Sequence, residues 1–376
     1  MKALALIGIS LVTGTSLLLA GPASAGPPDP GDRERPAVFV QTDSLTGNAI
    51  VAYRAAPDGT LRPAGTYPTG GLGGQLAGSV VDHLASQGSL QWDERHRQLF
   101  AVNAGSDTIT VFDVRGDALV RSQVVSSGGR FPVSLAVRDD EVYVLNALGG
   151  GSIQGFARHD GRLTELPGRH RELGLDPGGA PEFTHTPGQI AVTPDGRDLL
   201  VTTKAATSSI DVFPIDRSGR PADQPIVTSL PGAVPFAMAF DGHGRLLVAE
   251  AGTNAVATFN IGFDGHLRGV DQASTGQAAT CWVVSVGRHI YVSNAGSADL
   301  SGFTVDRHGR LVTLGTTGTD SGTVDAAASG DGRYLYVQTG AAGLVDEFAI
   351  NSGGSLTRIG TVTVPGATGG EGIATR

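Results

Sequence analysis

The feature that most constrains the fold is a short phrase that recurs along the chain. It occurs as "VNAGSDTITVF" at 102–112 and again as "VAEAGTNAVATF" and "VSNAGSADLSGF". Two runs rich in Val, Ile and Phe that flank a cluster of Asn, Gly, Ser and Asp are typical of a β-hairpin. A chain that writes one hairpin many times is built from repeated supersecondary units.

The aromatic residue that ends the second run of each copy sets the period. Successive aromatics lie 44 to 46 residues apart, with two longer gaps of 57 and 59. This period, with four apolar runs in each unit, is typical of the blades of a β-propeller. The sequence therefore predicts an all-β fold, a seven-bladed propeller of four-stranded antiparallel blades. The seven aromatic anchors are Tyr53, Phe112, Phe156, Phe213, Phe259, Phe303 and Phe348.

The two ends of the repeated region predict how the ring closes. The first copy begins at "AVFVQTD" and lacks an inner strand, whereas the tail "ATGGEGIATR" resembles the start of one. We expect residues 372–375 to supply the inner strand of the first blade, because closing a ring in this way removes its exposed edges. The propeller is therefore expected over 37–376, after a flexible segment over 26–36.

The N-terminal residues predict export. Lys2 precedes the apolar run "ALALIGISLVTGTSLLLAG", which leads to a cleavage-type pattern at Ala23-Ser24-Ala25. This combination is typical of a secretory signal peptide. We expect residues 1–25 to be removed after Ala25 and the mature chain to be secreted, into the periplasm or the medium, without a membrane span.

The composition excludes several classes of function. The net charge is −9 and no basic run occurs, so a nucleic-acid partner is not expected. Cys281 is the only cysteine, so no internal disulfide can form, and we expect it to be a small buried residue rather than a nucleophile. The nine histidines show no metal-ligand spacing. We expect a monomer without metal or cofactor.

The repeated units resemble the β-propeller lactonase family, which includes bacterial 6-phosphogluconolactonase and fungal carboxymuconate cyclase. The resemblance is carried by turns such as "TPDGRDLLVTT" and by the hairpin phrases, and "SQGSLQWDERHRQLFAVNAGS" is most similar to an exported branch. It implies metal-independent hydrolysis or isomerisation of a small lactone. Relatives often carry a Glu after the second strand of the blade that contains residue 250, and Glu250 matches this Glu with a shift of one residue. They often carry a histidine where blade 4 begins, and here His185 stands just before that point.

One position in each blade is expected to face the ligand. If the strands are lettered A to D from the channel outward, the B–C and D–A connections share one face of the ring. A position six or seven residues before strand C then forms a circle on that face. It is mostly a turn residue, as at Asn103, Asn146 and Asn294, but blades 4 and 5 carry Lys204 and Glu250 instead.

Two interpretations of these exceptions remain open. One is an inter-blade ion pair between Lys204 and Glu250, which contributes only about 0–1 kcal/mol when partly exposed. The other is catalytic: Glu250 acts as a base toward water and Lys204 stabilises the oxyanion, with His185 near them.

Further candidates come from the D–A connections. Arg130 is a candidate partner for a substrate carboxylate, although a surface arginine is the simpler interpretation, and Asp325 and Glu371 lie in other D–A connections. His83 lies in the first of two long insertions, at 70–88 and 170–187, which are candidate lids. The residues expected to contact a lactone are Arg130, His83, Asn103, Asn146 and Asn294.

The sequence leaves an alternative function open. A non-catalytic propeller would bind a ligand or a partner protein on the same face, and the fold alone does not decide between the two functions. An enzyme predicts a deep, narrow channel mouth in which Lys204, Glu250 and a histidine converge, whereas a scaffold predicts a wide, shallow face.

Overall fold

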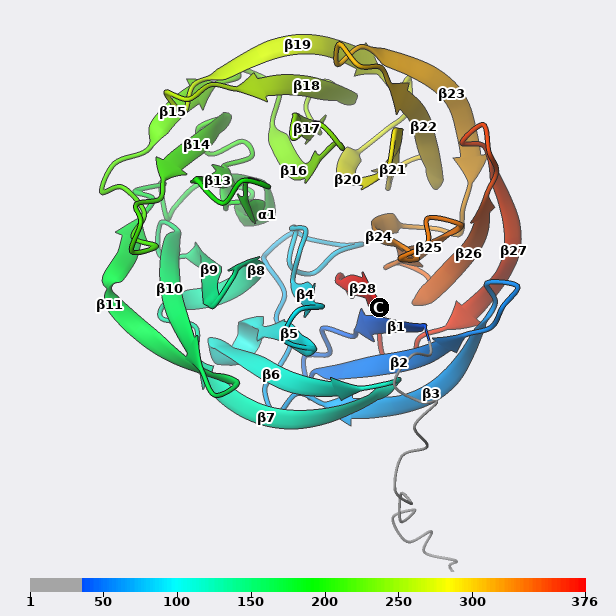
Figure 1. Ribbon diagram of the computed structural model, residues 1–376, viewed down its shortest axis with the longest axis horizontal. Helices are drawn as coiled ribbons and strands as arrows, with labels where there is room; N and C mark the ends of the chain where they lie inside the picture. The colour runs from blue at the N-terminus through cyan, green and yellow to red at the C-terminus, as the bar shows by residue number, and fades with distance from the viewer. Residues whose placement is uncertain (1–35) are drawn as a thin grey trace, which may run out of the picture.

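Seven four-stranded antiparallel sheets lie in a ring around a central axis (Figure 1). The structure is a computed structural model and describes residues 36–376. The seven-bladed propeller expected from the repeat is thereby confirmed. The predicted signal peptide, and all of the 26–36 segment except Pro36, lie outside the described residues and stay predictions.

The strands of each blade run from the channel outward in the order A to D. Blade 1 contains β28 (Ile373–Thr375), β1 (Ala37–Gln41), β2 (Ala49–Ala55) and β3 (Leu61–Pro68). Blade 2 contains β4 (Leu90–Asp93), β5 (Gln98–Asn103), β6 (Thr108–Arg115) and β7 (Ala118–Ser126). Blade 3 contains β8 (Arg130–Arg138), β9 (Glu141–Leu148), β10 (Ser152–His159) and β11 (Arg162–Glu172). Blade 4 contains β12 (Gln189–Val192), β13 (Asp198–Thr202), β14 (Ser209–Pro214) and β15 (Ile226–Ser229). Blade 5 contains β16 (Pro235–Phe240), β17 (Leu246–Glu250), β18 (Ala255–Ile261) and β19 (Leu267–Ser274). Blade 6 contains β20 (Thr280–Val286), β21 (His289–Asn294), β22 (Asp299–Val305) and β23 (Leu311–Gly318). Blade 7 contains β24 (Thr323–Ala328), β25 (Tyr334–Thr339), β26 (Leu344–Ile350) and β27 (Leu356–Thr363).

The core lies between neighbouring blades. Strand B is mainly apolar, and every residue of β5 and of β17 is buried, because both faces of a blade pack against other blades. The outer strands are different, and β27 exposes alternate residues on the rim. All seven aromatic anchors are at most 5% exposed, and burying one such side chain contributes roughly 1.5–3 kcal/mol.

A tyrosine of strand B joins three pairs of neighbouring blades. Its hydroxyl donates to the carbonyl of a glycine in the C–D turn of the next blade, and each of these glycines has a positive φ. We call this contact the tyrosine clamp. The three clamps are Tyr143 to Gly219 (2.6 Å), Tyr291 to Gly354 (2.8 Å) and Tyr336 to Gly59 (3.0 Å).

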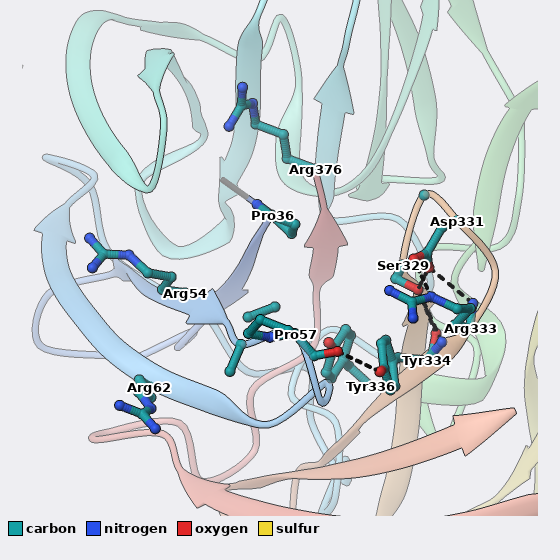
Figure 2. A pocket seen from close by; sticks show the side chains of 13 residues that line it. Pro36, Arg54, Pro57, Arg62, Ser329, Asp331, Arg333, Tyr334, Tyr336 and Arg376 are labelled. Atoms are coloured by element: carbon teal, nitrogen blue, oxygen red, sulfur yellow. Dashed lines mark hydrogen bonds and ion pairs between the residues drawn. The ribbon is translucent and has the colours of Figure 1, made fainter. Parts of the chain in front are cut away.

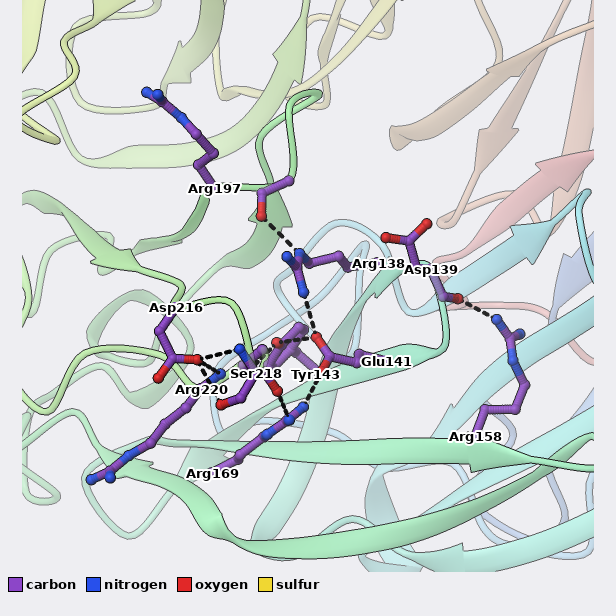
Figure 3. Close-up of polar contacts among 12 residues, drawn as sticks. Arg138, Asp139, Glu141, Tyr143, Arg158, Arg169, Arg197, Asp216, Ser218 and Arg220 are labelled. Carbon is purple, nitrogen blue, oxygen red and sulfur yellow. Dashed lines mark hydrogen bonds and ion pairs between the residues drawn. The ribbon is translucent and has the colours of Figure 1, made fainter.

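The clamp between blades 3 and 4 is surrounded by charged groups, as Figure 3 shows. Glu141 accepts hydrogen bonds from the hydroxyl of Tyr143 (2.9 Å) and from Nη1 of Arg138 (2.8 Å), and it forms an ion pair with Arg169. The carboxylate of Glu141 therefore lies opposite two guanidinium groups at this interface.

The C-terminal strand closes the ring as the sequence predicts. β28 pairs antiparallel with β1, with Val40 opposite Ile373 and Val38 opposite Thr375. The N–H of Gln41 also donates to the carbonyl of Gly372 (2.9 Å). Blade 1 is therefore made of the first and last strands of the propeller.

Helical structure is scarce within residues 36–376. It consists of α1 (Glu182–His185), a single turn in the second insertion, and a short 3₁₀ turn at Ala104–Ser106. No helix in this part of the chain has the length and apolar character needed to cross a bilayer.

Candidate functional site

The mouth of the channel is filled by residues 76–89 of the first insertion, which we call the mouth segment. It crosses the centre of the ring on its way from β3 to β4 (Figure 1). The hydroxyl of Ser86 donates to the carbonyl of Val133 in blade 3 (2.9 Å), and the Gln87 amide exchanges two hydrogen bonds with the main chain of Val283 in blade 6 (3.0 Å each). The hydroxyl of Ser89 donates to the carbonyl of Glu371 in blade 1 (2.9 Å). The first insertion therefore fills the mouth, where the sequence places a candidate lid.

The second insertion packs against the mouth segment. The N–H of Ala77 donates to Oε1 of Glu182 at the start of α1 (2.8 Å), and the N–H of Phe183 donates to the carbonyl of Ala77 (3.4 Å). The two insertions therefore form one continuous cap over the channel.

Lys204 lies directly beneath this cap and is 1% exposed. Its ammonium donates to the carbonyls of Ala85 (2.7 Å) and Phe183 (2.6 Å) and to Oγ1 of Thr186 (3.1 Å). It also lies over the ring of Phe236, 5.4 Å from the centroid. These contacts occupy all three N–H groups of the ammonium. Lys204, the residue that departs from the blade consensus in blade 4, therefore connects strand B of that blade to both insertions by hydrogen bonds.

Asp82, in the mouth segment, is the acidic group that interacts with Lys204 by charge. Its carboxylate accepts the N–H of Leu84 (2.7 Å) and of Ser86 (2.9 Å) and is 3% exposed. Burial raises the pKa of Asp82 to about 7 and lowers the pKa of Lys204 to about 7, although their mutual attraction opposes both shifts. Hydrogen bonding favours the charged form of each group. Burial nevertheless outweighs these interactions, and it brings the pKa of the carboxyl group and that of the ammonium to about the same value.

Three more carboxyl groups are buried beside the mouth segment. The N–H of Glu371 donates to Oδ2 of Asp43 (2.8 Å), Oε1 of Glu371 accepts the N–H of Gly88 (3.0 Å), and the carboxylate of Asp325 accepts the N–H of Ala326 (2.9 Å). Burial raises the pKa of Asp43 to about 8 and of Asp325 to about 6, and burial with neighbouring carboxylates raises the pKa of Glu371 well above its usual range. Burial therefore shifts each of these acids toward its protonated form.

Glu250 is not part of this cluster. It is 2% exposed, and its Oε2 accepts hydrogen bonds from Oγ1 of Thr253 (3.0 Å) and from the amide of Gln272 in the same blade. No ion pair among the described residues joins Glu250 to Lys204. The inter-blade ion pair considered from the sequence is therefore wrong, because Lys204 turns to the insertions and Glu250 turns to its own blade.

The two candidate histidines lie at different places in the cap. Nδ1 of His185 lies within hydrogen-bond distance of Oγ1 of Thr184 (2.9 Å) and of the carbonyl of Pro181 (3.0 Å), beside a cavity of only about 20 Å³. His83 lies in the mouth segment, where its N–H donates to the carbonyl of Gly369 (2.8 Å). Burial lowers the pKa of its imidazole. Neither histidine contacts Lys204 or Glu250 by a hydrogen bond in the described structure.

The asparagines at the equivalent positions of blades 2, 3 and 6 form hydrogen bonds within their own hairpins. The amide of Asn103 donates to Oγ1 of Thr110 (2.8 Å), and that of Asn294 donates to the hydroxyl of Ser301 (2.9 Å). Asn146 makes a longer contact of the same kind. This contact explains why the phrase recurs, because the amide ties the end of strand B to strand C. Arg130, at the start of β8, is exposed, and its guanidinium makes no hydrogen bond or ion pair within residues 36–376.

No group of three or more His, Cys, Asp or Glu side chains in the described part of the chain has the geometry of a metal site. Cys281 lies on β20 near Lys204 and Asp82, and burial raises the pKa of its thiol to about 12. A thiol with so high a pKa carries little thiolate, so it is a poor nucleophile. The chemistry available at the mouth is proton transfer by carboxyl and ammonium groups.

The comparisons with known proteins identify the fold. No family model matches the sequence, and no curated protein matches it. A putative 6-phosphogluconolactonase from Bacteroides fragilis is 20% identical with a TM-score of 0.72, over 93% of this chain and 100% of that one. The periplasmic gluconolactonase PpgL of Pseudomonas aeruginosa is 19% identical with a TM-score of 0.72, over 90% and 98% of the two chains. A streptogramin B lyase is more distant, at 14% identity and a TM-score of 0.52 over 76% and 85%.

These similarities confirm, at the level of the fold, the resemblance that the sequence shows to lactonase-like propellers. At such identities they do not transfer an activity, because one fold hosts many functions.

Proposed function

We propose that this chain is an exported propeller that hydrolyses or isomerises a small, unphosphorylated lactone without metal, with Asp82 and Lys204 as its acid–base pair. The observation that carries the proposal is the placement of these two groups. Both are buried at the channel mouth, and burial shifts the pKa of each to about 7. Side chains whose pKa lies near the working pH are the most efficient in general acid–base catalysis.

The roles follow from the charges of the two groups. The ionised carboxylate of Asp82 takes a proton from the attacking water, whose oxygen bonds to the lactone carbonyl carbon, and the ammonium of Lys204 stabilises the negative charge that develops on the carbonyl oxygen. As the carbonyl re-forms and the ring C–O bond breaks, the protonated Asp82 gives that proton to the departing ring oxygen. The base is thus assigned to Asp82 rather than to Glu250, which is engaged with Thr253 and Gln272. The ammonium of Lys204 already donates to Ala85, Phe183 and Thr186, so it offers little to a phosphate, and this disfavours a phosphorylated substrate.

Access to the pair requires the mouth segment to move. The mouth segment is held by Lys204, which donates to the carbonyl of Ala85, and by Asp82, which accepts the N–H groups of Leu84 and Ser86. The segment that covers Lys204 therefore also carries the base. Opening this turn would uncover the ammonium and the carboxylate together. Loops that close an active site in this way also exclude water from the reaction.

The experiment is an initial-rate assay of proton release with unphosphorylated γ- and δ-lactones, corrected for spontaneous hydrolysis and run with excess EDTA. Asp82→Asn and Lys204→Met should each lower kcat/KM by roughly 10²-fold. Asp264 carries an exposed carboxylate that pairs with Arg268. Asp264→Asn is the matched control and should keep the wild-type rate. Loss of activity in EDTA, or equal rates in all four proteins, would reject the proposal.

A second candidate is a propeller that binds a ligand or a partner protein on this face without catalysis. The sealing of the mouth favours it, since Lys204 and Asp82 are 1% and 3% exposed. It predicts no turnover of any lactone by the wild-type protein, together with saturable binding of a ligand measured by calorimetry. Turnover that depends on Asp82 would eliminate this candidate.

A further inference from the structure

The face opposite the mouth segment carries a pocket between blades 7 and 1, shown in Figure 2. Its volume is about 680 Å³, which suits a small organic molecule. The walls come from the turn 329–332 of blade 7 and from the end of β2 and its following turn in blade 1. It lies where the first and last strands of the propeller meet, far from the groups proposed for lactone chemistry.

The charged side chains around this pocket are mainly positive. One acid, Asp331, lines it together with four arginines: Arg54, Arg62, Arg333 and Arg376. This excess is unusual in a chain whose net charge is −9. Guanidinium groups gathered over a concave surface attract anions.

These arginines retain donors for a ligand. Arg54 pairs with Asp117 (2.6 Å) and Arg333 pairs through Nε with Asp331 (2.6 Å), and both arginines remain largely exposed. The guanidinium of Arg62 makes no hydrogen bond or ion pair within residues 36–376, and its charge acts on Asp58 only at longer range. A guanidinium has five N–H groups in a planar fork that matches a carboxylate or another oxyanion.

The floor and sides of the pocket are apolar and fixed in place. Ala55, Ala56 and Pro57 form one side, and Tyr334 and Tyr336 form the other. The two tyrosine hydroxyls donate to the carbonyls of Pro57 (2.9 Å) and Gly59 (3.0 Å) across the blade interface. Arg333 also lies over the ring of Tyr334, 5.2 Å from its centroid. Such a surface is ready to contact a planar apolar group without ordering side chains on binding.

A comparison of the three tyrosine clamps shows what is particular to this interface. Two residues before the clamp tyrosine, blade 3 carries Glu141, whereas blade 7 carries Tyr334. Glu141 binds the arginines of its interface, as Figure 3 shows. At the interface of blades 7 and 1 the same position offers an aromatic ring, so it adds no carboxylate to Asp117 and Asp331, which pair with Arg54 and Arg333.

We propose that this pocket binds a small organic anion with an apolar, aromatic body. The anionic group lies among Arg54, Arg62 and Arg333, and the apolar body lies against Tyr334 and the Ala55–Pro57 wall. The site is independent of the proposed lactone chemistry, because it lies on the other face and shares no residue with the mouth.

The test uses two fluorescent probes of similar shape and different charge. The anion is 8-anilinonaphthalene-1-sulfonate and its uncharged counterpart is N-phenyl-1-naphthylamine, each titrated into the folded protein at low ionic strength. We expect saturable binding of the anion, weakened by added salt, and binding of the neutral probe at least about tenfold weaker.

Two variants and a matched control locate the site. Arg62→Glu should weaken binding of the anion by at least about tenfold, and Tyr334→Ala should weaken binding of both probes severalfold. Arg268 is the control because it occupies the position of Arg62 in blade 5, so Arg268→Glu makes the same change of charge outside the pocket. The control should keep the wild-type affinity within about twofold.

Three results would overturn the proposal. They are the absence of saturable binding of the anion, equal weakening by Arg62→Glu and Arg268→Glu, and equal affinity for the neutral and the anionic probe. Melting curves of each variant separate loss of the site from loss of the fold. Since Arg62 is exposed, its substitution should leave the melting temperature within about 2 °C of wild type.

Discussion

Removal of β28 should destabilise the whole ring, because this short strand is the only inner strand of blade 1. In a chain ending at Gly370, β1 loses its partner, including the hydrogen bonds of Gln41 with Gly372 and of Ala37 with Arg376. The chain also loses the hydrogen bonds of Glu371 with Asp43, Gly88 and Ser89.

The magnitude follows from these contacts. A hydrogen bond contributes about 0.5–1.5 kcal/mol, so the ladder and the bonds of Glu371 contribute on the order of 5 kcal/mol. Ile373 is 5% exposed, and burial of its side chain adds about 2 kcal/mol. The total of about 7 kcal/mol is comparable with the entire stability of a typical domain, which is about 5–15 kcal/mol. The truncated chain should therefore fail to fold, or should melt more than about 10 °C below the full chain.

Differential scanning calorimetry and circular dichroism of the two proteins provide the measurement. The milder variant Ile373→Ala should lower the free energy of unfolding by about 2–4 kcal/mol, whereas Ile226→Ala, on the partly exposed outer strand β15, should lower it by less. A truncated protein that melts within about 2 °C of the full chain would show that closure through β28 does not stabilise the ring.

Three further predictions concern the clamp, the buried acids and export. Tyr336→Phe removes the hydrogen bond to Gly59 and should lower the free energy of unfolding, measured in urea titrations, by about 1–2 kcal/mol. Tyr334→Phe should lower it by less, because the hydroxyl of Tyr334 is more exposed. Equal losses in the two variants would contradict the role of the clamp. The pKa of Asp43 is raised to about 8, so the folded state holds an extra proton and the free energy of unfolding falls as the pH rises from about 4 to about 8. Asp43→Asn should flatten this fall between urea titrations at pH 5 and pH 8, and an unchanged slope would refute the assignment. N-terminal sequencing of secreted protein should begin at or near Gly26, and an intact Met1 on a membrane-bound form would contradict export.

The fold was predictable because each blade repeats the same local pattern. Two apolar runs around a cluster of Asn, Gly, Ser and Asp encode a hairpin, and the aromatic anchors give the period without any long-range information. Closure was predictable for a related reason. The first unit lacks an inner strand and the tail supplies one, so only one pairing completes the ring.

The site was predictable only in part, because it depends on a segment outside the repeat. Lys204 was found as an exception to the consensus of the blades, and the structure places it at the channel mouth. Its partner Asp82 lies in an insertion with no counterpart in other blades, so no register assigns its neighbours. Glu250 is an exception in the same register, yet Gln272 of its own blade binds it. Internal repeats identify which residues differ, but the direction of a side chain depends on packing.

The burial of carboxyl groups at the mouth was beyond the sequence for the same reason. Asp43 lies between β1 and β2, Asp325 lies within β24, and Glu371 lies just before β28, so each resembles an ordinary turn or strand residue in the sequence. They lose water only because the mouth segment covers them, through contacts such as that of Gly88 with Glu371. Their raised pKa values are therefore a property of the assembled ring.

The measurement that tests the central claim most directly is the rate of lactone hydrolysis by the double variant Asp82→Asn/Lys204→Met, compared with wild type on the best substrate of the lactone panel. The acid–base pair predicts that the double variant folds, as judged by its circular dichroism, and that its kcat/KM falls by roughly 10²-fold or more. It also predicts that the double variant is no slower than the slower single variant by more than about tenfold, because residues that act as one unit are not additive. A well-folded double variant that hydrolyses the lactone at the wild-type rate would contradict the claim and place the chemistry elsewhere on the ring.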